Sequence, residues 1–389
     1  MKPTTASSPA TEPAGEPISF FDLRAQHARL RTQIEIRLAR VLEHGSFVLG
    51  PEVQEFERRL TSYTGAPFAV TCANGTDALT IALMAEGIGP GDAVFLPSFT
   101  FTATAEAAAL IGATPVFVDV DERTFLIDHD DLERRLAAVR RKGELRRRAL
   151  IAVDLFGQTV DYDRLNALCD AERLLLIADA AQSFGARFRG RNVGALAPVT
   201  TTSFFPSKPL GCYGDGGALL TADEERAALY RSIRGHGSGE ARYDVVRIGL
   251  NSRLDSLQAA VLLAKINVVD EDRAARAALA AAYSEALGDR VVTPLILPER
   301  DSAWAQYVIQ VERRDAVQAA LKARGIPTAI YYPRPMHLQP AYARWSEGPG
   351  SLPVSERLSE RVLALPMHAD MRPETRGRII EGLREVVQG

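Results

Sequence analysis

Apolar and polar positions along the chain first form a long amphipathic pattern. The stretch LRAQHARLRTQIEIRLARVLEHG begins shortly after residue 19. Its apolar side chains fall on one face of a helix, and they are Leu30, Ile34, Leu38, Val41 and Leu42. Gly45 follows, and glycine is common where helices end. We therefore expect an amphipathic helix at the start of the folded chain.

Short apolar runs then alternate with stretches of helical period. The expected strands are 68–73, 93–99, 114–121, 148–157 and 173–181, and the expected helices are 75–88, 102–112 and 163–172. Apolar runs without polar alternation are typical of parallel strands buried on both faces. A repeated strand–helix–strand order predicts a parallel sheet covered by helices, and hence an α/β fold.

The pattern changes after Thr221. A stretch of helical period is long enough to bridge two domains, and shorter elements follow it. They are an expected helix at 252–287, a strand at 304–311, a helix at 315–325, a strand at 326–332 and a helix at 372–387. This order predicts a smaller α+β unit. We expect a disordered tail over 1–18, a large domain over 19–250, and a linking helix with a small domain over 251–389.

Charge and cysteine content exclude several classes of protein. The 389 residues carry a formal net charge of -3, which offers no electrostatic basis for a nucleic-acid or anionic-membrane partner. No apolar run is long enough to span a membrane, and the N-terminus lacks an apolar signal core. The cysteines are odd in number and lack CxxC spacing, and they are Cys72, Cys169 and Cys212. This pattern disfavours a disulfide framework or a zinc site, so we expect a cytoplasmic protein without a metal.

A lone lysine lies in the segment SFFPSKPLGCYGDGG, residues 203–217. Lys208 stands there between two prolines, in apolar and turn-rich surroundings. A dry environment lowers the pKa of an amine and frees its lone pair for attack on a carbonyl carbon. The segment therefore suits a Schiff-base lysine. It suits a lysine on a surface loop equally well.

A carboxylate follows the apolar strand in IADAAQSFGA, residues 177–186. Ligands of open parallel sheets lie beyond the carboxyl ends of the strands, where Asp179 is expected. A carboxylate there needs a cationic partner, and the protonated ring nitrogen of pyridoxal phosphate would provide one. Gln182 could then bind the phenolic oxygen of the cofactor. Alternatively, Asp179 caps the helix that follows.

Two further segments could bind a flat, phosphorylated cofactor. In TCANGTDAL (71–79), the amides at the start of the predicted helix would attract a phosphate. Gly75 permits close approach there, and Thr76 adds a hydroxyl. In PSFTFTATAEA (97–107), Phe101 follows a strand and could stack on a ring. Many turns between a strand and a helix resemble the first segment, and a core phenylalanine would explain the second.

Taken together, these motifs resemble the sugar-nucleotide aminotransferases of the DegT/StrS family, which are fold-type-I, pyridoxal-phosphate enzymes. The matching motifs, in chain order, are Asn74–Asp77, Asp179–Gln182, Ser203–Lys208 and Asn251–Asp255. The resemblance extends from residue 20 to the C-terminus. It implies a mostly parallel, seven-stranded sheet in a three-layer αβα large domain, with a smaller C-terminal α+β domain.

The resemblance also implies a role for each motif. Lys208 would bind the cofactor as a Schiff base and carry the proton during transamination. Dehydratase relatives have histidine at that position. Asp179 would pair with the ring nitrogen and Gln182 with the ring hydroxyl. The other cofactor contacts would come from Gly75, Thr76 and Ser203 at the phosphate, Phe101 on the ring, and Asn251 from the neighbouring subunit of a homodimer.

The exact residues of these motifs resemble those of one subgroup of that family. Its members aminate carbon 3 of UDP-linked 2-acetamido-3-oxo sugars, with L-glutamate as donor and 2-oxoglutarate as product, for bacterial surface polysaccharides such as lipopolysaccharide O-antigen. The resemblance favours UDP-2-acetamido-2-deoxy-3-oxo-glucuronate as the substrate.

One departure from the subgroup leaves the sugar open. Tyr331 replaces the usual histidine, whereas Tyr332 matches the tyrosine. Arg253 could still bind a uronate carboxylate bidentately, and Arg334 and His337 lie near in sequence. A neutral 3-oxo sugar, namely UDP-3-oxo-GlcNAc, or another nucleotide-linked ketosugar is the alternative. A dehydratase and a relative that binds the cofactor without catalysis are further alternatives, and filled catalytic positions disfavour both.

Overall fold

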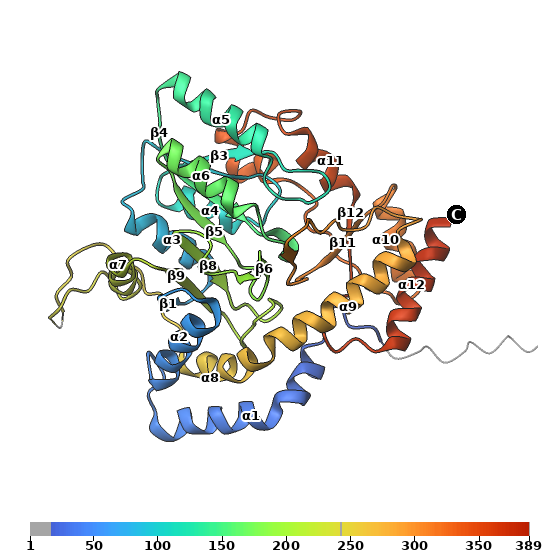
Figure 1. Ribbon diagram of the computed structural model, residues 1–389, viewed down its shortest axis with the longest axis horizontal. Coiled ribbons are helices and arrows are strands. Elements are labelled where there is room, and N and C mark those ends of the chain that lie inside the picture. The colour runs from blue at the N-terminus through green and yellow to red at the C-terminus, as the bar shows by residue number, and fades with distance from the viewer. Residues whose placement is uncertain (1–16, 242, 389) are drawn as a thin grey trace, which may run out of the picture.

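A seven-stranded sheet forms the centre of the computed structural model, which describes residues 17–241 and 243–388 (Figure 1). The strand order is β1-β9-β8-β5-β4-β2-β3, and only β9 runs antiparallel to its neighbours. The strands are β1 (Phe68–Cys72), β2 (Asp92–Pro97), β3 (Thr114–Val118), β4 (Arg146–Val153), β5 (Leu175–Asp179), β8 (Val199–Ser203) and β9 (Gly217–Thr221). The predicted α/β fold with a mostly parallel sheet is confirmed. The predicted tail falls almost entirely outside the described residues.

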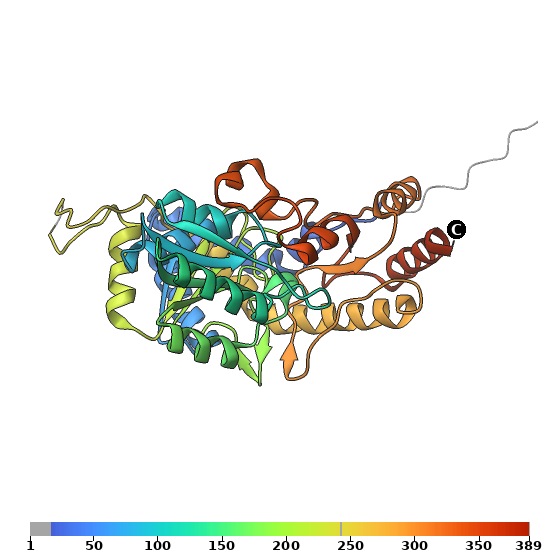
Figure 2. The same ribbon diagram turned by 90° about the horizontal axis from the view of Figure 1, so that it is seen from above.

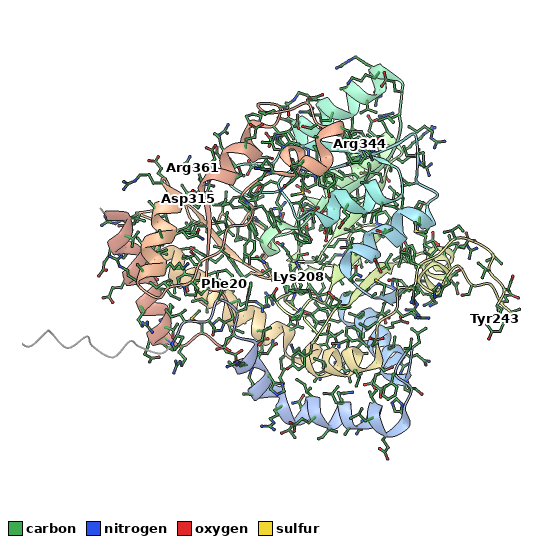
Figure 3. The ribbon with its side chains drawn as sticks, turned by 180° about the vertical axis from the view of Figure 1, so that it is seen from behind. Phe20, Lys208, Tyr243, Asp315, Arg344 and Arg361 are labelled. Carbon is green, nitrogen blue, oxygen red and sulfur yellow. The ribbon has the colours of Figure 1, made fainter. Side chains whose placement is uncertain are left out.

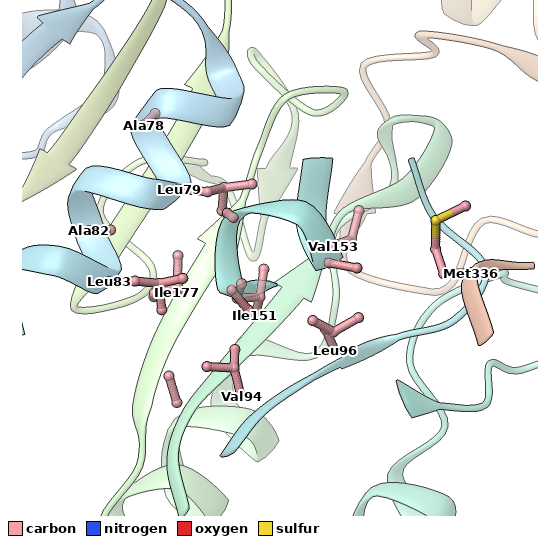
Figure 4. Packing of buried hydrophobic residues seen from close by; sticks show 14 of the residues in the cluster. Ala78, Leu79, Ala82, Leu83, Val94, Leu96, Ile151, Val153, Ile177 and Met336 are labelled. Carbon is pink, nitrogen blue, oxygen red and sulfur yellow. The ribbon is translucent and has the colours of Figure 1, made fainter. Parts of the chain in front are cut away.

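Helices cover both faces of this sheet, because alternate strand residues point to opposite sides. One face carries α3 (Gly75–Ala85), α4 (Ala103–Leu110) and α7 (Glu224–Arg234). The other carries α2 (Pro51–Thr64), α5 (His129–Lys142), α6 (Tyr162–Glu172) and α8 (Ser256–Lys265). Figure 4 shows α3 packed on the first face, where Leu79 and Leu83 lie beside Ile151 and Ile177. The result is a three-layer αβα arrangement.

The first predicted helix is α1 (Leu23–His44), and Gly45 ends it in a left-handed conformation. It packs on α8 through a narrow apolar stripe formed by Leu30, Ile34 and the half-buried Leu38, and Val41 is buried as well. Leu42 was expected on the same face but is 64% exposed. A single neighbouring helix covers only a narrow stripe, and Leu42 lies about 100° around the axis from Val41.

The long helix predicted over 252–287 is interrupted. α8 ends at Lys265, a short 3-10 turn spans Ile266–Val268, and α9 (Val269–Leu287) continues. Asn267 lies in that turn, and its side-chain amide donates to the Leu263 carbonyl over 3.2 Å. A side chain that competes for backbone partners in this way disfavours a regular helix. Figure 2 shows α9 running from the sheet to the C-terminal elements.

The C-terminal part contains a two-stranded antiparallel sheet, β11 (Tyr307–Gln310) and β12 (Val362–Leu365). The helices of this part are α10 (Arg314–Ala323), α11 (Pro353–Arg361) and α12 (Pro373–Gln388). The strand predicted over 326–332 is wrong. Only Ala329 bridges to β12, because Pro327 has no amide hydrogen with which to extend the pairing. The domain division near residue 250 stays a prediction.

A few short elements complete the fold. Three two-residue strands pair as a small sheet, and 3-10 turns connect several larger elements. These are β6 (Arg187–Phe188), β7 (Arg191–Asn192), β10 (Arg300–Asp301), and the turns Leu155–Gly157, Met336–Leu338 and Pro340–Trp345. In the part of the chain that the structure describes, no helix is both long and apolar enough to cross a lipid bilayer.

Candidate active site

Four segments that are distant in sequence meet at one edge of the central sheet. The strands β1, β5 and β8 end there at Cys72, Asp179 and Ser203, and β9 begins there at Gly217. Gly217 pairs with Cys72 on one side and with Ser203 on the other. The topology therefore brings three of the predicted cofactor-binding motifs to one place, at the carboxyl ends of parallel strands.

The start of α3 forms a cradle against the end of β8. The Asn74 side chain accepts from the Asp77 amide over 2.8 Å and so caps the helix. A methyl group added at Gly75 would lie 2.7 Å from the Ser203 Cβ atom, so only glycine fits. The first amides of α3, at Gly75 and Thr76, have no partner within the helix and remain available to an anion.

Asp179 is buried at the end of β5. One carboxylate oxygen accepts from the Ala181 amide over 3.1 Å, and the other accepts from the Thr104 hydroxyl over 3.4 Å. Burial raises the pKa of this carboxyl, while these hydrogen bonds and the positive charge of Lys208 act in the opposite direction. The segment after β5 is a turn rather than a helix, so the alternative role as a helix cap is wrong.

Lys208 follows β8 in a turn where its amide donates to the Phe205 carbonyl over 2.9 Å. Burial lowers the pKa of the Lys208 amine, and the nearby carboxylate of Asp179 opposes that effect. This environment differs from that of a solvated surface lysine. Lys208 also lines a pocket, together with Phe21 and Trp304. Figure 3 shows Lys208 in the interior, between the sheet and the C-terminal elements.

Gln182 connects the site to the C-terminal part of the chain. Its side-chain oxygen accepts from the Phe156 amide over 2.6 Å, and its nitrogen donates to the Tyr332 hydroxyl over 3.3 Å. The ring centroids of Phe101 and Tyr332 lie 6.3 Å apart. Phe101 is 52% exposed, so the alternative reading of this residue as a core phenylalanine is wrong.

Two predicted residues, the exposed Asn251 and the half-buried Arg253, lie apart from these contacts. Asn251 accepts a hydrogen bond from the Arg253 guanidinium, and neither residue bonds to Lys208 in a single chain. Ser252, between them, accepts from the Ala73 amide over 3.1 Å and so holds the motif beside the end of β1.

The two basic residues that follow Tyr332 do not together form a binding site for a substrate carboxylate within one chain. Arg334 is exposed, whereas His337 is buried. The imidazole of His337 bonds to Ser98 and Glu356, so it does not offer a free charge to a uronate.

Three contacts of the site were not predicted from the sequence. Thr104 bonds to Asp179 across 75 residues, and the Phe156 amide orients Gln182 across 26 residues. The Phe20 ring packs edge-on against Tyr331, with centroids 6.3 Å apart. None of these contacts has a local signal. The apolar pair Phe20–Phe21 before the first helix is the only hint of the last one.

These residues fit pyridoxal phosphate. The cradle at α3 offers amides to a phosphate, and the buried carboxylate of Asp179 suits a protonated ring nitrogen. The amine of Lys208 lies close enough to Asp179 for the two charges to interact. An amine with a lowered pKa suits attack on an aldehyde carbon.

A Gly75→Ala substitution tests the cradle. The added methyl group would displace Ser203 or the start of α3, so we expect the Kd for pyridoxal phosphate to rise about tenfold or more, which corresponds to about 1.4 kcal/mol. Absorbance titration of the apoenzyme measures this affinity. Gly377→Ala in α12 is the control, because no atom lies within 4 Å of its added methyl group. Equal affinity in both variants would exclude this position for the phosphate.

The chain matches the model of the DegT/DnrJ/EryC1/StrS aminotransferase family over residues 29–384. It is 47% identical over 352 residues to the UDP-2-acetamido-2-deoxy-3-oxo-D-glucuronate aminotransferase of Pseudomonas aeruginosa, covering 90% of this chain and 95% of that protein. It is 41% identical over 376 residues to the UDP-N-acetyl-3-dehydro-alpha-D-glucosamine 3-aminotransferase of Acidithiobacillus ferrooxidans, covering 96% of this chain and 98% of that protein.

Solved structures agree with this assignment. The crystal structure of a family member from Brucella abortus superposes with a TM-score of 0.94 at 49% identity, covering 96% of this chain and 100% of that one. A Bacillus subtilis protein crystallised with its bound cofactor PMP superposes with a TM-score of 0.87 at 28% identity, covering 97% and 86%. The chain is therefore a member of the DegT/DnrJ/EryC1/StrS aminotransferase family, and it is a pyridoxal-phosphate-dependent sugar aminotransferase.

Proposed function

We propose that this enzyme transfers the amino group of L-glutamate to carbon 3 of a UDP-linked 2-acetamido-3-oxo sugar, with UDP-2-acetamido-2-deoxy-3-oxo-glucuronate as the favoured substrate. The observation that carries the proposal is the proximity of the Lys208 amine to the buried Asp179 carboxylate, in a chain 47% identical to the Pseudomonas aeruginosa aminotransferase. The proposed product would be the corresponding 3-amino sugar, a precursor of a surface polysaccharide.

Each site residue has a proposed task. When bound, pyridoxal phosphate supplies an electron-withdrawing ring that stabilises negative charge on the reacting carbon. Asp179 would keep the ring nitrogen protonated, and Gln182 would hold the ring hydroxyl. The Lys208 Nζ atom would remove the proton from the amino donor and deliver a proton to carbon 3 of the sugar. Gly75, Thr76 and Ser203 would bind the phosphate, and Phe101 would cover the ring.

Tyr331 bears on the identity of the sugar. Its side chain lies against Phe20 and Tyr332 and carries no positive charge. A phenol offers one hydrogen bond to a uronate, whereas Arg253 could donate two. The uronate proposal therefore depends on Arg253, and the neutral UDP-3-oxo-GlcNAc is the second candidate. The 41% identical relative from Acidithiobacillus ferrooxidans supports this second candidate.

The complete reverse reaction distinguishes the two sugars. The pyridoxal form would be mixed separately with UDP-2-acetamido-3-amino-glucuronate and with its neutral glucose analogue, each with 2-oxoglutarate. We expect glutamate to form faster with the uronate, and Arg253→Ala to remove that preference while Lys322→Ala, on the exposed face of α10, preserves it. Reaction of the neutral sugar alone would assign the second candidate. Reaction of neither sugar would contradict the proposed substrate class.

We also propose that two copies of the chain share their sites. Several exposed apolar side chains lie near site residues. Phe205 is close to Lys208 in sequence, and Val48, in the exposed segment Phe47–Leu49, bridges to Asp255 of the Asn251 motif. Residues 236–241 and 243–248 extend from the body of the molecule, as Figures 1 and 3 show, and Val245 and Ile248 are 63% and 83% exposed. An apolar surface of this kind favours burial against a second copy. Asn251, at the base of this loop, would then reach the phosphate of the partner's site.

Mixing two inactive variants tests this arrangement. Lys208→Ala and Asn251→Ala subunits would be unfolded together and refolded, so that half of the dimers are mixed. Each mixed dimer would contain one intact site, which predicts about a quarter of wild-type activity. Activity equal to the mean of the two parent variants would contradict shared sites.

We further propose a reducing cytoplasm as the location, because all three cysteines are free thiols.

A further inference from the structure

A buried serine, a buried histidine and a partly exposed glutamate form a continuous chain of hydrogen bonds near the segment that carries Tyr331 and Tyr332. The Ser98 hydroxyl lies 2.7 Å from the His337 Nδ1 atom, and the His337 Nε2 atom lies 3.1 Å from the Glu356 carboxylate. Ser98 directly follows β2, whereas His337 lies 239 residues further along the chain, shortly after Tyr332. The contact therefore ties the sheet to the segment that carries the proposed sugar-binding tyrosines.

The hydrogen bonds show which group donates and which accepts at each step between Ser98, His337 and Glu356. The His337 amide donates to the Ser98 hydroxyl oxygen over 3.2 Å, so the serine hydroxyl is free to donate to Nδ1. The proton on Nε2 then points to Glu356. Burial lowers the pKa of His337, although Glu356 opposes this, so the ring stays neutral and the donor order holds at neutral pH.

This group does not have the features of a hydrolytic triad. The side chain of Ser98 is fully buried and that of His337 is 2% exposed. The serine oxygen is already occupied by a backbone amide, so it has no access to a substrate. The arrangement can hold a segment in place but cannot attack a carbonyl carbon.

Neighbouring contacts make the attachment rigid. The Met336 amide donates to the Ser98 carbonyl over 2.8 Å, and its side chain packs in the sheet core beside Leu96 and Val153 (Figure 4). Glu356 lies in α11, whose first turn is capped by Asp119 from the end of β3. The ends of two adjacent strands, β2 and β3, thus hold both sides of the His337 ring.

The attached segment leads directly to the site. Tyr332 precedes Met336 by four residues, and its ring lies 6.1 Å from that of Phe99, which follows Ser98. Its hydroxyl accepts from Gln182. Displacement of His337 would therefore move Tyr331 and Tyr332 relative to Phe101, while Lys208 and Asp179 are held by other elements.

We propose that Ser98, His337 and Glu356 are positioning residues for the nucleotide-sugar half-reaction: they fix the Tyr331–Tyr332 segment against the sheet without acting on the glutamate half-reaction. The inference rests on the proposed function insofar as it assigns the tyrosines to the sugar. It goes beyond that function by assigning a task to three residues that touch neither cofactor nor substrate.

Paired substitutions of His337 separate its two contacts. The amide of asparagine lies near the position of Nδ1 and can still bond to Ser98, whereas that of glutamine reaches toward Nε2 and Glu356. We expect His337→Gln and Ser98→Ala to raise the KM for the 3-amino sugar about tenfold, the effect of one lost hydrogen bond. His337→Asn should remain within about threefold of wild type. The rate of the glutamate half-reaction should change less than about twofold in all three variants.

His129→Asn is the matched control, because His129 begins α5 and is partly exposed. It should change neither half-reaction. Equal losses in both half-reactions of Ser98→Ala would show a merely structural role and overturn the proposal. An unchanged sugar KM in both Ser98→Ala and His337→Gln would overturn it as well.

Hydrogen exchange provides a readout that needs no sugar. The Ala329 amide donates to the Ala364 carbonyl over 3.2 Å and reports on the segment before Tyr331. We expect the amides of 329–332 to exchange about tenfold faster in Ser98→Ala than in wild type or His129→Asn. Unchanged exchange would overturn the positioning role. Exchange could be faster in Ser98→Ala while the wild-type enzyme accepts neither amino sugar. That outcome would support the positioning role and contradict only the proposed substrate.

Discussion

Replacing Lys208 with alanine is expected to lower the rate of both half-reactions by at least about 10⁴-fold, the upper end of the range for a lost general acid–base group. The enclosed amine, with its pKa lowered by burial, is the group proposed to move the proton at the reacting carbon. Stopped-flow absorbance with glutamate measures this loss directly. Borohydride reduction of the wild-type holoenzyme, followed by peptide mapping, should find the cofactor on Lys208.

Two controls test whether the loss of activity is specific to the Lys208 amine. Lys142→Ala removes an exposed lysine at the end of α5 and should have wild-type rates. Methylamine added to Lys208→Ala should restore part of the activity, because a small amine can enter the space left by the side chain. Near-normal rates in Lys208→Ala, or labelling of a different lysine, would contradict the assignment of the nucleophile.

Asp179→Asn is expected to produce the second-largest effect, a loss of about 10² to 10³-fold in kcat, which corresponds to about 3–4 kcal/mol and lies in the range for a buried ion pair that loses one partner. An amide cannot stabilise a protonated ring nitrogen, so the cofactor would lose most of its electron-withdrawing power. Single-turnover rates with glutamate measure the change. A kcat within about threefold of wild type would contradict the pairing of Asp179 with the ring.

Asp154→Asn is a matched control for that experiment. Asp154 is a fully buried carboxyl at the end of the adjacent strand β4, and it accepts hydrogen bonds from Val160, Tyr162 and Ser183. Because an amide cannot accept all three bonds, we expect a loss of about 1–3 kcal/mol in unfolding free energy. The kcat of the folded variant should stay close to that of wild type. Chemical denaturation and turnover assays separate the two effects.

The parallel sheet and the positions of the Asp179 and Lys208 motifs at its edge could be predicted because their signals are local. Asp179 ends an apolar run, and Lys208 lies in an apolar turn, so each could be assigned without knowing its neighbours. The strand β8 was not predicted, because its threonines resemble a polar segment. Thr201 and Thr202 are buried and donate to the Ala178 and Ala180 carbonyls, which satisfies their hydroxyls inside the sheet.

The features that the sequence does not predict depend on contacts between residues that are far apart in the chain. The position of His337 near the tyrosines in sequence suggests a partner for a substrate carboxylate, but Ser98 and Glu356 occupy its ring. The tyrosine segment is expected to be a strand, but its strand-type pairing is limited to one bridge at Ala329. In both places the local pattern is compatible with several structures, and tertiary packing decides between them.

The antiparallel strand β9 has a consequence for synthesis of the chain. β1 enters the sheet only through β9, so the first strand to leave the ribosome cannot be paired until Thr221 has emerged. Pairing over so long a separation is slow, and an unpaired apolar strand can associate with other chains in the meantime. Because Gly217 also packs against Asn74, cofactor capture would follow this late step, and pyridoxal phosphate present during expression should increase the yield of folded protein.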